Sequence, residues 1–242
     1  MTIIPAMDII KGKCVRLTQG DYNQKTEYNA DPLDMAKRFE DAGLTHLHLV
    51  DLEGAKAKHI VNYKVLETLA SKTSLKIDFG GGVKTDAAIN IAFESGAAQI
   101  TAGSVAARNP EQVARWVASY GAERIIIGAD VKNKMIAVSG WKETTSLAVI
   151  PFIESYIPLK LHRVICTDVA KDGMLRGPSV DLYKELLEAI PTLQLVASGG
   201  ISSLKDLGIL EQIGCDAAII GKAIYEGRLS LSELEKWNAN AH

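Results

Sequence analysis

The sequence has few cysteines and no long apolar run. Its 242 residues include only Cys14, Cys166 and Cys215, too few and too widely spaced for a disulfide framework or a C-x-x-C metal knuckle. Cys166 lies within VICTD, so we expect a buried strand residue rather than a nucleophile. No apolar run approaches the roughly 18 residues that span a bilayer, and the first residues lack the basic region and cleavage site of a signal peptide. These absences predict a cytoplasmic protein without a membrane partner.

The sequence also lacks an excess of charge of one sign. The formal net charge is -2, and the Lys and Arg residues are scattered, which argues against nucleic-acid binding. There is no HExxH motif, no cluster of His with carboxylates at metal-ligand spacing and no GxGxxG after the first β-rich run. We therefore expect no metal and no other cofactor, and no obligatory protein partner is evident. With 47% apolar and 23% charged residues, the composition is that of an ordinary globular protein.

What the sequence does contain is a regular alternation of β-rich and helical segments. The helical segments have 3.6-residue apolar spacing and marked ends, as where Asp31 and Pro32 begin one and Gly43 ends it, or where Asn109 and Gly121 enclose another. The β-branched runs between them predict eight strands, at 3–8, 46–51, 75–80, 97–103, 124–130, 163–168, 193–198 and 216–221.

Eight strand and helix units predict a parallel sheet that is covered on both faces. At this length we expect one α/β domain over residues 1–242, a (β/α)8 TIM barrel. An open doubly wound sheet is the structural alternative, because the pattern alone does not distinguish closure from an open edge.

The second half of the chain repeats the strand-end and turn motifs of the first at an offset near 117–122 residues. Asp8 corresponds to Asp130, and VDL at 50–52 corresponds to TDV at 167–169. DFGGGVKT likewise aligns with ASGGISS, and AGSVAARN with IGKAIYEG. The period is far longer than that of solenoids or propellers, so the repeat predicts two similar half-barrels.

Polar residues that end β-rich runs are the candidates for chemistry, since reacting groups in a TIM barrel project from the C-terminal ends of the strands. The candidates are Asp8, Asp51, Asp130, Thr167 and Asp168. Strands one and five face each other, so Asp8 and Asp130 are predicted to lie on opposite sides of one mouth as an acid and base pair. The alternative is that either aspartate caps the turn that follows it.

Glycine clusters after the predicted strands three, four, seven and eight predict two phosphate cups that face each other across the mouth. Glycine allows an anion to approach the backbone, but tight turns also require it without any ligand. Two cups predict a small-molecule bisphosphate substrate, whose centre lies between the carboxylates. The residues assigned to the cups are Gly81, Gly82, Gly103 and Ser104 in the first half, and Gly199, Gly200, Gly221 and Lys222 in the second.

Two long segments after strands one and five, at 19–32 and 132–145, are predicted to form lids. Trp141 in the second is expected either to stack on a heteroaromatic ring or to pack over the rim. Arg16 is a candidate for binding an anion or for a surface ion pair. His48 either points into the barrel and orients a carboxylate or is a core histidine, and the second interpretation is slightly favoured.

At these residues the sequence resembles the phosphoribosylformimino-aminoimidazole-carboxamide ribotide (ProFAR) isomerase family of histidine biosynthesis. The likeness extends over nearly the whole chain. It implies an Amadori rearrangement of an aminoaldose to an aminoketose, without cofactor or metal, on a ribotide with a phosphate at each end. The motifs that carry it are PAMDIIKGKCVRLTQGDY, HLVDLEGA, FGGGVKT, AGSVAARNP, ADVKNKMIAVSGW, CTDVAKDGMLRGPS, ASGGISS and IGKAIYEG.

Carried onto this chain, the resemblance implies that Asp130 is the general acid that opens the ribose ring and that Asp8 is the base that removes the C2′ proton. Thr167 and Asp172 would then hold the sugar hydroxyls. The chain departs from the commoner family wording at Met7, at ADVKN and at GML, and none of these departures falls on a proposed proton carrier.

Three alternatives stay open at this level. The related cyclase uses the same barrel and also has aspartates at the ends of strands one and five, but its first strand resembles PCLDV. A dual isomerase that also serves tryptophan biosynthesis usually has Arg before GW in the fifth loop, where this chain has Ser139. A non-catalytic barrel that only binds sugar phosphates would tolerate the loss of one carboxylate, and both are present.

Overall fold

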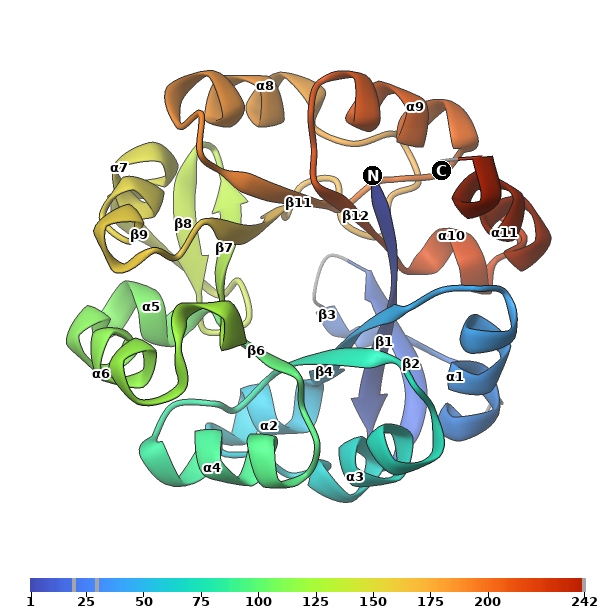
Figure 1. The fold of residues 1–242 in the computed structure, drawn as a ribbon, viewed down its shortest axis with the longest axis horizontal. Helices are drawn as coiled ribbons and strands as arrows, with labels where there is room; N and C mark the ends of the chain where they lie inside the picture. Colours follow the sequence, from blue (N-terminus) through green and yellow to red (C-terminus); the bar gives the residue numbers. More distant parts are fainter. Residues whose placement is uncertain (19–20, 29–30, 241–242) are drawn as a thin grey trace.

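Eight parallel strands close into a barrel in the computed structural model, which describes residues 1–18, 21–28 and 31–240 (Figure 1). Pairing of β10 with β7 joins the two ends of the ladder, so the open-sheet alternative is wrong and the predicted TIM barrel is confirmed. All eight predicted strands are present, in this order around the barrel: β1 (Thr2–Ile10), β4 (His46–Asp51), β5 (Lys76–Gly80), β6 (Gln99–Ala102), β7 (Ile125–Lys132), β10 (Arg163–Asp168), β11 (Gln194–Ser198) and β12 (Ala217–Ile220).

Helices cover the outside of the barrel. The predicted caps are present, since Asp31 accepts the backbone N–H groups of Leu33 and Asp34 and Asn109 accepts that of Gln112. The helices are α1 (Pro32–Asp41), α2 (Leu52–Ala57), α3 (Tyr63–Lys72), α4 (Asp86–Glu94), α5 (Ser104–Arg108), α6 (Pro110–Tyr120), α7 (Val149–Glu154), α8 (Val180–Ala189), α9 (Leu204–Gln212), α10 (Lys222–Tyr225) and α11 (Leu231–Asn240), with 3-10 turns η1 (Ala122–Arg124) and η2 (Ile157–Leu159).

The buried apolar residues form two clusters, one between the barrel and the helices and one inside the barrel. Because side chains alternate along a strand, Ile4 and Ala6 on the inner face of β1 put Asp8 on that face at the strand end. Ile126 on β7 places Asp130 in the same way. The inner cluster consists of Ile4, Ala6, Ile126, Ile165, Val196, Ala217 and Ile219, which come from β1, β7, β10, β11 and β12.

Two antiparallel hairpins extend the barrel where loops were predicted. β2 (Lys13–Thr18) and β3 (Asp21–Glu27) continue from β1, and β8 (Met135–Val138) and β9 (Glu143–Ala148) continue from β7. The interpretation of 19–32 and 132–145 as loops is therefore wrong over about half of each range, because extended segments pair with the ends of their own barrel strands. Residues 19, 20, 29 and 30 lie outside the described residues. Closure as a lid stays a prediction.

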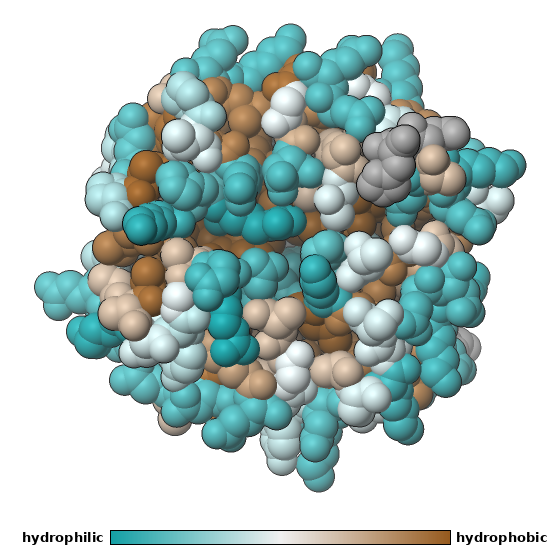
Figure 2. Space-filling model, in the orientation of Figure 1, coloured by the Kyte–Doolittle hydropathy of each residue, from teal (hydrophilic) through white to brown (hydrophobic). Residues whose placement is uncertain are grey.

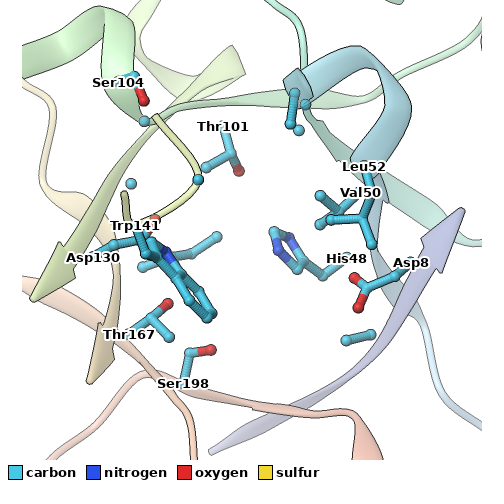
Figure 3. Close-up of a pocket in the computed structure, with 18 of the residues that line it drawn as sticks. Asp8, His48, Val50, Leu52, Thr101, Ser104, Asp130, Trp141, Thr167 and Ser198 are labelled. Atoms are coloured by element: carbon cyan, nitrogen blue, oxygen red, sulfur yellow. The ribbon is translucent and has the colours of Figure 1, made fainter. Parts of the chain in front are cut away.

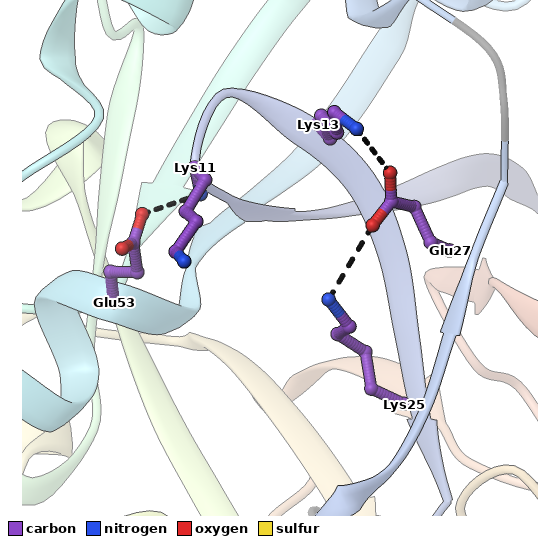
Figure 4. Close-up of polar contacts among 5 residues, drawn as sticks. All are labelled: Lys11, Lys13, Lys25, Glu27 and Glu53. Carbon is purple, nitrogen blue, oxygen red and sulfur yellow. Dashed lines mark hydrogen bonds and ion pairs between the residues drawn. The ribbon is translucent and has the colours of Figure 1, made fainter.

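Charged side chains line the outer edge of the first hairpin (Figure 4). Glu27 on β3 forms ion pairs with Lys13 on β2 and with Lys25, and Glu53 accepts the backbone N–H of Lys11. These groups are largely exposed, so each contact contributes little to stability. They nevertheless link the start of the hairpin to α2, beside the mouth of the barrel.

Figure 2 shows one face of the molecule, with hydrophilic side chains spread across it and hydrophobic ones visible between them. The most exposed large hydrophobic residues in the described part of the chain are Val61, Tyr63, Ile91 and Leu147, each at about 40% exposure. Val61 and Tyr63 lie two residues apart at the start of α3, whereas Ile91 and Leu147 come from α4 and β9, so they form no single large patch in the sequence. None of the described helices is long and apolar enough to cross a membrane.

Candidate functional site

A cavity of about 240 Å³ lies at the C-terminal ends of the barrel strands (Figure 3). A second cavity of about 20 Å³ lies beside it, next to β11 and β12. The structure brings all fifteen predicted site residues to these cavities, while the role of each stays a prediction. The large cavity is lined by Asp8, Arg16, His48, Gly81, Gly82, Gly103, Ser104, Asp130, Trp141, Thr167 and Asp172, and the small one adds Gly199, Gly200, Gly221 and Lys222.

Asp8 forms an ion pair inside the large cavity. The Nη1 atom of Arg16 donates to Oδ2 of Asp8 at 2.9 Å, and the two side chains are only 11% and 15% exposed. The interpretation of Arg16 as a surface ion pair is therefore wrong, because the β2 strand folds back on β1 and carries Arg16 over the mouth. Burial would lower the pKa of Arg16, but the charges of Asp8 and Asp172 outweigh it and raise that pKa.

Asp130 lies across the cavity from Asp8 in Figure 3. It accepts side-chain hydrogen bonds from Trp141 and Thr167, and Thr167 is its neighbour on β10. Burial raises the pKa of Asp130, while these hydrogen bonds and the charge of His48 offset part of the rise. Asp130 is thus buried with hydrogen-bond partners, whereas Asp8 is paired with a cation.

The β8–β9 turn carries Trp141 into the cavity. Ser139, Gly140 and Trp141 all have φ between 60° and 66°, a left-handed run that is uncommon for non-glycine residues. The turn is held by a residue of the first predicted cup, because the backbone N–H of Ser139 donates to Oγ of Ser104 at 3.0 Å. Trp141 was expected either to stack on a ligand ring or to pack over the rim of the barrel. In the structure its ring lines the cavity and its side chain donates a hydrogen bond to Asp130, so packing over the rim does not describe it fully.

The glycine pairs after β5 and β11 have matching conformations, with φ from 82° to 97°. A Cβ on Gly81 would lie 2.1 Å from the carbonyl oxygen of Asp51, and one on Gly199 would lie 3.0 Å from that of Asp168. The close packing of neighbouring loops therefore requires glycine here with or without a ligand. This agrees with the interpretation that the tight turns themselves need glycine. These turns still line the cavities, so their N–H groups remain candidates for binding an anion.

The two predicted cups are not equally open. Gly103 and Gly221 adopt similar backbone conformations before α5 and α10, with ψ of -102° and -95°. The guanidinium of Arg16 lies over Gly221, where a Cβ would come within 1.9 Å of Nη2. The Lys222 ammonium also donates to the carbonyl of Gly173 at 3.0 Å. The second cup is thus narrower because basic side chains already occupy part of it.

Asp172 lies at the boundary of the two cavities. Burial raises its pKa to about 6, although the charges of Arg16 and Lys222 oppose the rise. Asp172 therefore titrates close to neutral pH and is placed to accept or donate a hydrogen bond.

Two of the strand-end candidates have structural roles. Asp51 is fully buried and accepts backbone N–H bonds from Gly54, Val61 and Asn62, together with one from the Asn62 side chain. Asp168 accepts bonds from the backbone of Ala170 and the hydroxyl of Ser179. The carboxylates therefore tie the loops after β4 and β10, and the cap interpretation applies to this pair of aspartates.

His48 points into the cavity and bonds a residue that the sequence analysis missed. Its Nδ1 lies 2.7 Å from Oδ1 of Asp78, the residue beside it on β5, and the Thr101 hydroxyl donates to the same oxygen at 2.7 Å. An aspartate in the middle of an otherwise apolar strand, level with a histidine on the preceding strand, was the signal that could have identified it. The preferred interpretation as a core histidine is incomplete, because His48 lines the cavity.

The three cysteines are free and buried, as expected for Cys166. Burial raises the pKa of each thiol, which disfavours the reactive thiolate. Within the described ranges, no three His, Cys, Asp or Glu side chains are grouped so as to hold a metal ion.

Comparison with known proteins agrees with this arrangement. The model of the family described as "Histidine biosynthesis protein" matches residues 2–230. The chain belongs to this family. A Flavobacterium psychrophilum protein is 56% identical over 240 residues, which are 99% of this chain and 100% of the relative. Proteins from Parabacteroides distasonis (55% over 232 residues; 96% and 97% coverage) and Cytophaga hutchinsonii (56% over 237 residues; 98% and 99%) are similar. All three are named as isomerases of an imidazole-4-carboxamide with two phosphoribosyl groups.

Proposed function

We propose that this protein catalyses the Amadori rearrangement of the aminoaldose ProFAR to the corresponding aminoketose, PRFAR, in histidine biosynthesis. The observation that carries the proposal is the pair of matched carboxylates, Asp8 and Asp130, on opposite sides of one cavity at the ends of β1 and β7. The names of the relatives, which span nearly the whole chain, support the same reaction.

In the proposed mechanism Asp130 starts as the acid. Its carboxyl, whose pKa is raised by burial, gives a proton to the ring oxygen as the C1′–O bond breaks and leaves a protonated Schiff base. Asp8 then takes the proton from C2′, and the electron pair forms the C1′=C2′ bond of the enolamine. Asp8 returns that proton to C1′ while the C2′ hydroxyl gives its proton to Asp130. The product is the aminoketose, and both carboxyls regain their starting states.

The remaining cavity residues are proposed to bind and orient the substrate. The turns with Gly81, Gly82, Gly103 and Ser104 form one phosphate site, and the turns with Gly199, Gly200 and Gly221 form the other, where Lys222 and Arg16 add positive charge. Thr167 and Asp172 are proposed to hold sugar hydroxyls, and Trp141 to cover the ligand. Binding of the two terminal phosphates would hold the reacting carbons between Asp8 and Asp130.

The proposal also includes the cofactor requirement, the location and the partners of the enzyme. The chemistry described above needs only proton transfer, so we propose that the enzyme uses no cofactor or metal. We further propose a cytoplasmic location and independence from an obligatory protein partner, with no nucleic-acid or membrane ligand.

Incubation of the purified protein with ProFAR tests the proposal directly. The expected result is an absorbance change with a stoichiometric yield of PRFAR in the presence of a metal chelator. Parallel reactions with phosphoribosylanthranilate, and with PRFAR plus ammonia, test the dual-isomerase and cyclase alternatives and should be inactive. Binding of ProFAR without turnover would identify a sugar-phosphate-binding barrel and refute the proposal.

A further inference from the structure

The inner lining of the barrel breaks the twofold repeat at three positions. His48, Asp78 and Thr101 project from β4, β5 and β6 and form one hydrogen-bonded cluster. His48 and Thr101 line the large cavity, and His48 is the member of this polar cluster that lies beside Asp8 in Figure 3. In the second half, the residues that occur 117 or 118 positions later are apolar members of the inner cluster: Ile165, Val196 and Ile219.

Packing of the barrel does not require these polar groups, because the second half fills the matching positions with hydrocarbon. The side chains of His48 and Asp78 are only 14% and 6% exposed. Removing an ion pair from water costs free energy that its internal attraction seldom exceeds, so apolar replacements of similar size are often as stable. A buried polar pair that the fold does not need points to a functional role.

The geometry shows what the pair presents to a ligand. Asp78 bonds Nδ1 of His48, and the Thr101 hydroxyl fixes the same carboxylate oxygen from the neighbouring strand. Among the described contacts the ring bonds protein through Nδ1, so Nε2 is the nitrogen that faces the cavity. His48 lies between Asp8 and Trp141 in the view of Figure 3. A donor at this place meets the centre of a ligand that spans the two glycine cups.

We propose that Asp78, held by Thr101, is a positioning residue that keeps His48 protonated and directs its Nε2–H as a hydrogen-bond donor at a sugar oxygen between Asp8 and Asp130. The proposal rests on the proposed isomerase function for the identity of that oxygen. The oxygen on C2′ is the group whose proton must leave before the ketone forms, and a nearby cation stabilises the negative charge that develops there.

Electrostatics agree with the geometry. Burial by itself lowers the pKa of His48, but the charge and hydrogen bond of Asp78 and the charge of Asp8 raise it above the ordinary value, against the opposing charge of Arg16. Asp130 on β7 is the remaining facing carboxyl, and the charge of His48 in turn lowers its pKa. The imidazolium thus lies among three carboxyl groups and one guanidinium.

The test replaces Asp78 by Asn, which keeps an acceptor for Nδ1–H but removes the charge. We expect the His48 pKa, followed by NMR titration of its ring in the ligand-free protein, to fall by at least about one unit. We expect kcat for ProFAR to fall about 10- to 100-fold at pH 8 with KM within about threefold, and the fall to be partly recovered at lower pH where His48 is protonated again. Asp41→Asn makes the same chemical change on the exposed end of α1 and should change neither quantity.

A second variant copies the other half of the barrel. His48→Ile, Asp78→Val and Thr101→Ile combined should fold with a melting temperature equal to or above that of the wild type, and should lose at least as much activity as Asp78→Asn. Wild-type His48 that is neutral at pH 7, or an Asp78→Asn protein with unchanged His48 titration and an unchanged kcat profile, would overturn the inference. A wild-type protein that does not convert ProFAR would refute the proposed function instead, and the titration would still decide the state of His48.

Discussion

The two halves of this barrel repeat the same order of four barrel strands with a hairpin after the first, and they differ in what they present to its interior. Both halves place an aspartate at the end of their first strand, follow their third strand with a pair of glycines at positive φ, and tie the loop after the second strand with an aspartate carboxylate. Inside the barrel, the first half has His48, Asp78 and Thr101 where the second half has apolar residues.

This difference separates the needs of the fold from those of a ligand. Positions that match between the halves hold the backbone together, as Asp51 and Asp168 do, or belong to the proposed phosphate sites and the proposed pair of proton carriers. Positions whose residues differ between the two halves contribute to one side of the cavity only. Asp172 has Ala55 as its first-half counterpart, and Arg16 enters the second cup from the first hairpin. A cavity for a ligand with two similar ends and a different centre requires such a departure from symmetry.

The largest expected effect tests whether the matched aspartates are equally needed. Replacing Asp8 or Asp130 by Asn removes the proposed base or acid while keeping its volume, so kcat for ProFAR should fall at least about 1000-fold in each variant. Stopped-flow or steady-state absorbance measures the loss, and circular dichroism controls for folding. A variant that keeps more than a tenth of wild-type activity would show that the two halves do not contribute alike.

The loop-tying aspartates should differ in stability. Asp51→Ala leaves four hydrogen-bond donors without their acceptor in a fully buried site, and should lower the free energy of unfolding by more than about 3 kcal/mol. Asp168→Ala removes two bonds in a more open site and should cost about 1–2 kcal/mol. Urea denaturation followed by tryptophan fluorescence measures both. Equal losses of unfolding free energy in the two variants would contradict the conclusion that Asp51 stabilises its loop more than Asp168 does.

The glycine turns offer a smaller contrast. A methyl group at Gly81 would meet a backbone oxygen at 2.1 Å, whereas at Gly199 the nearest backbone atom would lie 3.0 Å away. Both positions have positive φ, so we expect Gly81→Ala to cost about 2–3 kcal/mol and Gly199→Ala about 1–2 kcal/mol. Thermal unfolding at one pH gives the order of the two variants, and the reverse order would show that the Asp51 segment moves aside more readily than the Asp168 segment.

The smallest effect concerns Asp172. Its pKa of about 6 in the folded protein lies above the ordinary value of 3.8, so its contribution to stability is present below about pH 4 and is lost as the pH rises through 6. Relative to Asp172→Asn, the wild type should lose about 1–2 kcal/mol between pH 4 and pH 7. Urea midpoints measured across this range provide the check. A constant difference between the two proteins would place the pKa of Asp172 at its ordinary value.

Much of the architecture follows from local sequence. The eight strands, the caps at Asp31 and Asn109 and the facing positions of Asp8 and Asp130 were predicted from β-branched runs, turn residues and the internal repeat. The two hairpins were interpreted as loops, because a polar extended segment such as β9 shows no apolar period until its pairing partner is known. Asp78 was missed because its role depends on its pairing with His48 in the neighbouring strand.

The sequence by itself determined the (β/α)8 alternation, the repeated halves and the residue types at the mouth, because strand, helix and turn preferences depend on residues close together in the chain. Tertiary structure alone decided that β10 meets β7, that Arg16 fills part of the second cup and that Asp78 bonds His48. These contacts join residues from separate elements. Their existence depends on the closure of the barrel and on strand register, which no local pattern specifies.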